Sequence, residues 1–311
     1  MYIEEWLENG KRTLIITTNT ILANQIKEAV KDVLAETSLN SGDIINFKRN
    51  DHSPIRISTI SSPSLLNSAN EEYSVLVVDE AQTILSEQYY QKFEEIRSLM
   101  RENARVICLQ PSDGYKDQQK SVLESLKDPI VLETDSAHSV PRHIKQTFHR
   151  MKFPERDLEL IRLLKDEQMT LIFVNRQSDL KTVFRVLQMY NISYVSVHKP
   201  MNTEQKSREL FKFKSGKSSV LITTDGLNAG LNLPNLKRVV NWSSPPSVAI
   251  YLNRLGRLGR LDSNFVGECI TFSVSHKGNH AIQKVEEAMR RNAKVNELDK
   301  NYDFNPNFYD E

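Results

Sequence analysis

The sequence predicts an α/β protein with two parallel-sheet domains, the first of them truncated at its amino-terminal end. Short apolar runs alternate with amphipathic stretches along most of the chain, and this alternation is typical of βαβ units. A length of 311 residues suits two domains of ordinary size. The composition, 39% hydrophobic and 26% charged, is that of a globular protein.

The first half carries the expected strands 13–17, 43–47, 55–59, 74–78, 105–109 and 130–133. Between the first two, apolar residues recur every three or four positions from Leu22 to Leu34, which predicts a helix. A second helix is expected at 89–100.

The second half repeats this pattern. Its expected strands are 144–149, 170–174, 194–197, 219–223, 238–242 and 267–273. Its expected helices are 154–164, 178–189, 203–213, 248–254 and 279–292. A polar link at 134–141 ends in Pro141, so we expect domains at 1–140 and 141–300, followed by a flexible tail at 301–311.

The sequence argues against a secreted or membrane-spanning protein. No apolar run approaches the roughly 20 residues that span a bilayer, and the first residues lack the basic region of a signal peptide. Cys108 and Cys269 lie in apolar segments and are expected to be buried free thiols. An intracellular location is therefore expected.

Charge divides unevenly along the chain. Residues 1–140 hold 14 Lys+Arg and 22 Asp+Glu, a net of −8, whereas the remainder holds 27 and 18, a net of +9. This difference could arise by chance. It also fits an anion-binding surface in the second half.

Two carboxylates follow the apolar run 75–78 directly. Ligands of open parallel sheets bind beyond the carboxyl ends of the strands, so Asp79 and Glu80 are well placed for chemistry. In a nucleotide site, Asp79 would hold Mg²⁺ through water and Glu80 would orient or deprotonate the attacking water. The alternative is that both residues only cap the next helix. Asp225, after the run 220–224, occupies a similar position.

Three arginines, Arg254, Arg257 and Arg260, stand at i, i+3 and i+6. Arg257 and Arg260 are separated by Leu258-Gly259 and could both face one γ-phosphate. An arginine placed opposite Mg²⁺ contributes about 10³–10⁵ in rate to phosphoryl transfer. The alternative is a solvated basic turn.

These residues resemble the DEAD-box RNA helicases of helicase superfamily 2. Asp79-Glu80-Ala81-Gln82 is similar to motif II, with its final Asp replaced by Gln82. Residues 253–260 are similar to motif VI, His-Arg-Ile-Gly-Arg-Thr-Gly-Arg. Other similar segments follow in the family's order at 22–26, 171–175, 205–208, 223–225 and 230–234.

The resemblance implies two RecA-like domains, ATP and Mg²⁺ as cofactors, and binding of single-stranded RNA without sequence preference. It implies catalytic roles for Asp79, Glu80, Arg257 and Arg260, with Asp79 also holding the metal. It assigns nucleotide contacts to Asn232, Arg257 and Arg260, and RNA contacts to Asn175, Gln205, Arg208, Thr224 and Gly230. For Gln205 and Arg208 a solvated helix face is the alternative.

Several positions depart from the family pattern. The motif Ia segment Pro-Thr-Arg-Glu is replaced by residues 18–21, the motif Ib slot holds 61–64, and the Ser-Ala-Thr slot holds 110–112. Ala229 stands where motif V has an arginine. These changes affect positions expected to contact RNA or to couple the domains.

The largest departure is the phosphate loop, which should precede Thr13, where the chain begins too late to contain it. Gly10-Lys11 is followed by Arg12 in place of Ser or Thr, and Gly216-Lys217-Ser218 precedes a strand, so neither fits the pattern. Losing several preorganised donors should lower hydrolysis by on the order of 10⁵. The chain alone is therefore expected to be a very poor ATPase.

Two functions remain open. The first is a DEAD-box RNA helicase-like protein that binds the RNA backbone and remodels RNA or RNA–protein complexes, as a truncated product or a divergent pseudoenzyme. The second is a catalytically inactive scaffold that binds RNA or a protein partner. RNA affinity that falls steeply with salt would favour the first over a protein-binding scaffold.

Overall fold

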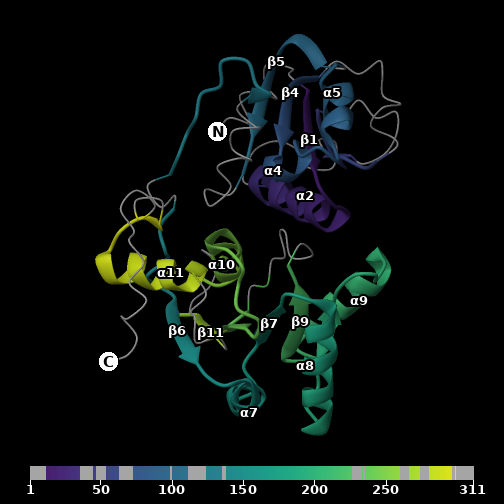
Figure 1. Cartoon of the computed structure of the whole chain (residues 1–311). Helices are drawn as coiled ribbons and strands as arrows, with labels where there is room; N and C mark the ends of the chain where they lie inside the picture. The colour runs from purple at the N-terminus through teal and green to yellow at the C-terminus, as the bar shows by residue number, and fades with distance from the viewer. Residues whose placement is uncertain are drawn as a thin grey trace. The chain divides into compact units, whose positions relative to one another are not determined.

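The computed structural model describes residues 12–35, 45–46, 54–62, 73–98, 100–110, 124–134, 138–225, 233, 235–259, 266–273, 280–295 and 298. The chain divides into two compact units, and along the sequence the main division falls between Leu132 and Glu133. Figure 1 shows the sheet and helices of each unit.

Among the described residues, the first unit holds a parallel sheet of five strands in the order β2-β3-β1-β4-β5. Its strands are β1 (Thr13–Thr17), β2 (Ile45–Asn46), β3 (Ile55–Thr59), β4 (Tyr73–Val78) and β5 (Met100–Cys108). Helix α2 is Thr20–Ala35, α4 is Ala81–Ile84 and α5 is Tyr90–Ser98.

Alternate side chains of this sheet enter two different cores. Ile15 of β1 packs with α2 residues such as Leu34, whereas Ile16 packs with Phe93 of α5 and with residues of α4. A strand covered on both faces needs apolar side chains at successive positions. This explains the unbroken buried run of β1.

The second unit has six described strands in the order β6-β11-β10-β7-β9-β8, again all parallel. The strands are β6 (Lys145–Arg150), β7 (Thr170–Val174), β8 (Val195–Val197), β9 (Val220–Thr224), β10 (Arg238–Asn241) and β11 (Glu268–Ser273). The helices are α7 (Phe153–Leu164), α8 (Gln177–Met189), α9 (Thr203–Lys214), α10 (Val248–Leu255) and α11 (His280–Arg291).

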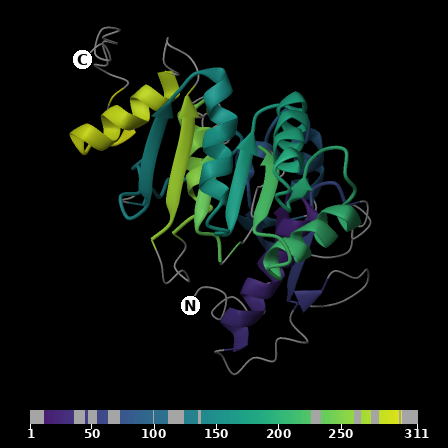
Figure 2. The same ribbon diagram turned by 90° about the horizontal axis from the view of Figure 1, so that it is seen from below.

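Helices cover both faces of this sheet as well, as Figure 2 shows from below. Ile172 and Val240 pack with α7 and α8 in one core. Phe173 is one residue along and faces the other way, where Arg254 of α10 lies over its ring. Helix α11 packs against α10. The centre of the sheet is thus fully buried, and its carboxyl ends carry the polar residues.

Most of the predicted elements are confirmed, with ends that differ by a few residues. One predicted strand is wrong: residues 129–134 have no regular structure, and Ile130 and Leu132 are 86% and 90% exposed. No described strand pairs with this segment, so its apolar residues have no sheet to bury them. The short helix α4 was not predicted, and β5 starts at Met100 instead of 105.

The two cysteines differ in burial. Cys269 is fully buried, as predicted, whereas Cys108 is only half-buried. Burial raises the pKa of Cys269 to about 12 and that of Cys108 to about 11, so neither is a reactive thiolate at neutral pH. Within the described ranges, every helix is too short or too polar to cross a bilayer. Trp6 and the predicted tail at 301–311 lie outside these ranges.

Gly259 offers a test of the loop that follows α10. Its φ is +60°, and a Cβ there would lie 2.4 Å from Nε2 of His143. Gly259→Ala should therefore lower the free energy of unfolding by about 1–3 kcal/mol, through backbone strain and displacement of His143. Urea unfolding followed by the fluorescence of Trp242 measures this loss.

Gly216→Ala is the matched control. Gly216 also has a positive φ, +74°, but a Cβ there would meet nothing within 4 Å. This variant should lose only the backbone term, about 1 kcal/mol. Equal losses in the two variants would contradict the close approach of His143 to Gly259.

Candidate functional site

The carboxyl end of β4 places Asp79 beside the end of β1. The Asp79 amide donates to the Ile16 carbonyl at 2.9 Å, and its Oδ2 accepts from Thr17 Oγ1 at 3.4 Å. Burial raises the pKa of Asp79 above its ordinary value, while hydrogen bonds from the Glu80 backbone and from Thr17 oppose this shift. A partly buried carboxylate at a strand end is suited to bind a cation.

Glu80 occupies a left-handed backbone conformation, with φ 57° and ψ 46°. Such a conformation is uncommon for a residue with a side chain and carries a free-energy cost of about 1–2 kcal/mol. Two backbone bonds hold the turn, from Leu109 to the Val78 carbonyl at 2.8 Å and from Ala81 to the Leu109 carbonyl at 2.9 Å. Glu80 stands at the N-cap of α4, yet its side chain makes no capping hydrogen bond. Helix capping therefore does not explain its carboxylate.

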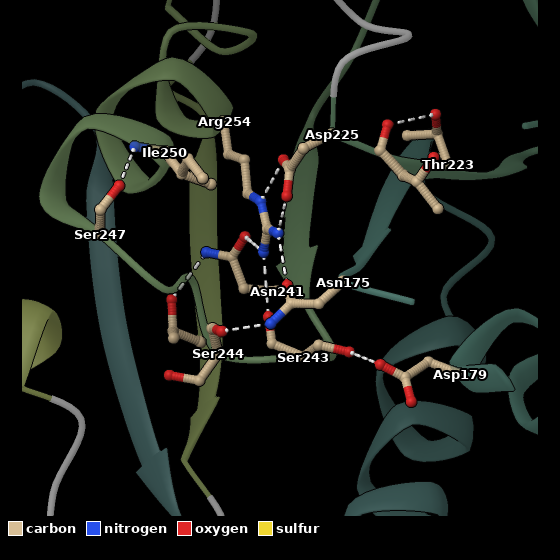
Figure 3. Close-up of polar contacts among 12 residues, drawn as sticks. Asn175, Asp179, Thr223, Asp225, Asn241, Ser243, Ser244, Ser247, Ile250 and Arg254 are labelled. Carbon is tan, nitrogen blue, oxygen red and sulfur yellow. Dashed lines mark hydrogen bonds and ion pairs between the residues drawn. The ribbon is translucent and has the colours of Figure 1, made fainter. Parts of the chain in front are cut away.

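The second unit is organised around Arg254, whose guanidinium is buried with 1% of the residue exposed. All five N–H groups of the side chain have acceptors, as Figure 3 shows. The Nε–H group and one N–H group of Nη2 donate to the two carboxylate oxygens of Asp225. The others donate to Asn241 Oδ1 at 3.2 Å, the Ser243 carbonyl at 2.9 Å and Asn175 Oδ1 at 2.7 Å.

These acceptors follow three neighbouring strands of the sheet. Asn175 follows β7, Asp225 follows β9, and Asn241 and Ser243 lie at the end of β10. Because β7 lies between β10 and β9, one side chain from α10 ties the carboxyl ends of the three central strands together. Every donor of Arg254 is used inside the protein, so it is not free to bind a ligand.

The residues next to Arg254 were predicted to contact a phosphate. Arg257 is half-buried, and its Nε donates to the Asn253 carbonyl at 3.2 Å. Arg260, Asn232 and Gly230 lie outside the described residues. The expected pairing of Asp79 and Glu80 with Arg257 across the two units stays a prediction.

The remaining predicted RNA contacts lie at the carboxyl edge of the second sheet or in the first half of α9. Thr224 ends β9, and Asn175 is exposed, but its Oδ1 accepts from Arg254 and its Nδ2 donates to the Ser244 carbonyl at 2.9 Å. Gln205 forms a capping box with Asn202. Arg208 is more open, with 67% of its side chain exposed and an ion pair to Glu209 at 3.6 Å.

Sequence reasoning missed the structural role of Arg254 and the contact of Gln82 with Glu80, at 2.6 Å. The signal for the first was present, because Asn175, Asp225 and Asn241 each stand at the end of an apolar run. Within the described ranges, no cluster of three His, Cys, Asp or Glu could hold a metal by itself.

The chain was compared with known proteins. A family model described as DEAD/DEAH box helicase matches residues 1–136, and one described as helicase conserved C-terminal domain matches residues 155–262. The chain belongs to the DEAD-box helicases of superfamily 2. The resemblance inferred from motifs II and VI is thereby confirmed.

Two curated relatives illustrate the match. ATP-dependent RNA helicase DRS1 of Candida albicans is 30% identical over 217 residues, which are 69% of this chain and 35% of that protein. Probable ATP-dependent RNA helicase DDX28 of Homo sapiens is 26% identical over 244 residues, 71% of this chain and 45% of that protein. The chain therefore spans less than half the length of these DEAD-box relatives.

Solved structures agree in fold. S. cerevisiae Dbp5 bound to RNA and ADP BeF3 matches with a TM-score of 0.73 at 18% identity, covering 90% of this chain and 75% of that chain. Mss116p bound to ssRNA and AMP-PNP matches with a TM-score of 0.68 at 16% identity, covering 91% and 62%. These matches confirm the predicted class of two RecA-like parallel-sheet domains.

Replacing Arg254 tests its role in the second unit. Arg254→Met retains a long side chain without the charge. It leaves Asp225, which is 31% exposed, and the amide oxygens of Asn175 and Asn241 without their donor. We expect the free energy of unfolding to fall by about 2–4 kcal/mol. The loss could lie in the lower part of this range because Asp225 is partly exposed and water can solvate its unpaired charge. Urea unfolding measures it, with Arg162→Met as control, since Arg162 forms an exposed pair with Glu159. An equal loss in both variants would contradict the role of Arg254.

The turn at Asp79 and Glu80, called the acidic turn below, gives a prediction about how the stability of the protein depends on pH. The raised pKa of Asp79 means that the folded state binds a proton more tightly than the unfolded state, so ionisation of Asp79 costs stability as pH rises above its ordinary value of 3.8. Asp79→Asn removes this cost and keeps an oxygen for Thr17. The variant should be more stable than the wild type at pH 7, and the gain should shrink as pH falls towards 3.8. A gain independent of pH would rule out this explanation.

Proposed function

We propose that this chain forms the core of an RNA helicase-like protein that binds the sugar–phosphate backbone of single-stranded RNA along the carboxyl edge of its second unit. The observation that carries the proposal is the network centred on Arg254. It fixes the ends of β7, β9 and β10 at one edge of the sheet. Family membership and the names of the relatives support the same function.

Charge supports an anionic ligand at this edge. Arg176 lies two residues after β7 and Lys199 two residues after β8; both are exposed, and neither has an ion-pair partner among the described residues. Arg208, midway along α9, adds a third cation. The second half of the chain carries the net positive charge, +9 for residues 141–311. Contacts of this kind favour phosphates regardless of base sequence.

The first unit supplies only part of an ATP site. Asp79 and Glu80 fit the metal and the attacking water, and Arg257 of the second unit fits a phosphate. No phosphate-cradling glycine loop occurs among the 311 residues. We therefore propose that ATP hydrolysis by this chain alone is weak. When ATP and Mg²⁺ are bound they provide the phosphoryl group and its counter-charge, and the residues named here position and orient them.

A second candidate is a scaffold that binds a protein partner and has lost RNA contact. The observation that favours it concerns Asn175, whose side-chain oxygen and nitrogen both form hydrogen bonds within the protein. Ala229 in place of the motif V arginine points the same way. Direct measurement of RNA binding separates the two candidates.

A filter-binding titration with single-stranded RNA at several salt concentrations tests the proposal. The wild type should bind, with an affinity that falls steeply as salt rises. Arg208→Gln should weaken binding by about 3–10-fold at low salt and lower the slope against log salt by roughly 0.7, the value for one lost phosphate contact on a single strand. RNA of different base sequence should give similar results.

Arg185→Gln is the matched control. Arg185 is exposed like Arg208 but lies more than two turns along α8 from the carboxyl edge. The Arg185→Gln variant should bind RNA with the same affinity as the wild type. Absence of binding even at low salt would reject the RNA function and favour the scaffold, and equal losses in the two variants would move the RNA site away from this edge.

A further inference from the structure

The side chain of Gln82 bonds to the second carboxylate of the acidic turn. Its Nε2 donates to Glu80 Oε2 at 2.6 Å, a short distance typical of a hydrogen bond to a charged acceptor. Gln82 lies in the first turn of α4, and Glu80 stands at its N-cap. The family has an aspartate at this position, as the motif match showed, and an ionised aspartate has no hydrogen to donate.

The chemistry of the carboxylate fixes the orientation of the Gln82 amide. If the amide were reversed, its oxygen would face the oxygen of Glu80, and both atoms are acceptors. In the observed orientation the amide oxygen is buried and has no hydrogen-bond partner among the described residues. An unsatisfied buried acceptor costs free energy. The contact with Glu80 is thus kept although it leaves the other end of the same amide unpaired.

The backbone of Glu80 is held as firmly as its side chain. Glu80 lies in the left-handed region, with φ 57°. The hydrogen bond from the Ala81 amide to the Leu109 carbonyl ties this turn to the end of β5. A strained backbone persists where the surrounding structure over-determines it, and such positions cluster at functional sites. Contacts within the turn and with the end of β5 therefore hold both the carboxylate and the main chain of Glu80.

We infer that Gln82 is a positioning residue, which holds the Glu80 carboxylate in a single orientation for the water that attacks the nucleotide. This inference rests on the proposed nucleotide site. A second carboxylate at position 82 would repel Glu80, whereas the neutral amide attracts it and leaves the turn with two negative charges instead of three. Gln82 acts through Glu80 and does not itself touch the reacting atoms.

The side-chain amide of Gln82 reports the contact directly in a ¹H–¹⁵N spectrum of the full chain, without nucleotide. Gln82→Met identifies the resonance by its loss. In the wild type this amide should exchange with water about tenfold more slowly than a free glutamine amide, since a hydrogen bond to a charged group contributes more than a factor of ten. Glu80→Ala should abolish that protection and shift the resonance.

Gln91, exposed on α5, is the internal control, and its amide should be the same in every variant. Gln82→Met also removes the unpaired oxygen, so its thermal unfolding midpoint should stay within about 2 °C of the wild type. A Gln82 amide that exchanges as fast as Gln91 and ignores Glu80→Ala would overturn the inference.

Turnover then separates the inference from the proposed function. Where the wild-type chain hydrolyses ATP, Gln82→Met should lower kcat about tenfold and leave KM within twofold, since orientation is lost and binding is not. A protected amide without any ATP turnover would leave the contact established and reject hydrolysis at this turn. Unchanged kcat in Gln82→Met would overturn the positioning role.

Discussion

The buried guanidinium of Arg254 is the constraint on which the second unit depends. A charge inside a protein must be fully paired, or its desolvation outweighs what it contributes. Here every donor has an acceptor, and the acceptors come from the ends of three strands and one loop. The edge of the sheet is consequently fixed to α10, and the backbone that bears Thr224 and Asn175 has little freedom. A ligand that bound at this edge would meet a surface that is already ordered.

Strands were predictable where burial on both faces demands it. The runs 13–17 and 170–174 have apolar residues at successive central positions and coincide with β1 and β7. Ends were less certain where polar residues extend a strand, as Arg150 does in β6 and Thr224 in β9. The segment 130–133 shows the limit of this reasoning: its apolar residues are as suitable for a strand as the others, but no strand in the described part of the chain pairs with them. Pairing is a tertiary fact that a local pattern does not contain.

The site was predictable in position and less so in role. Carboxylates after apolar runs located Asp79 and Asp225 at the carboxyl edges of the two sheets, because parallel strands all end on the same side, whereas Asn175 was singled out only by the family resemblance. Their partners could not be inferred, since an arginine such as Arg254 has the same local context whether it is buried or solvated. Asn175 illustrates the consequence. It was expected to contact RNA, and the structure shows that its amide already bonds to Arg254 and Ser244.

Both units carry unfavourable terms. In the second, the buried charge of Arg254 is saturated with hydrogen bonds, whereas Nε and Nη2 of the buried Arg156 have no hydrogen-bond partner among the described residues. In the first, three unfavourable features meet within four residues: the desolvated carboxylate of Asp79, the left-handed backbone of Glu80 and the unpaired oxygen of Gln82. None of them improves packing. Local costs of this kind are expected at sites shaped by function, and their concentration at one turn argues that the acidic end of β4 is under functional constraint.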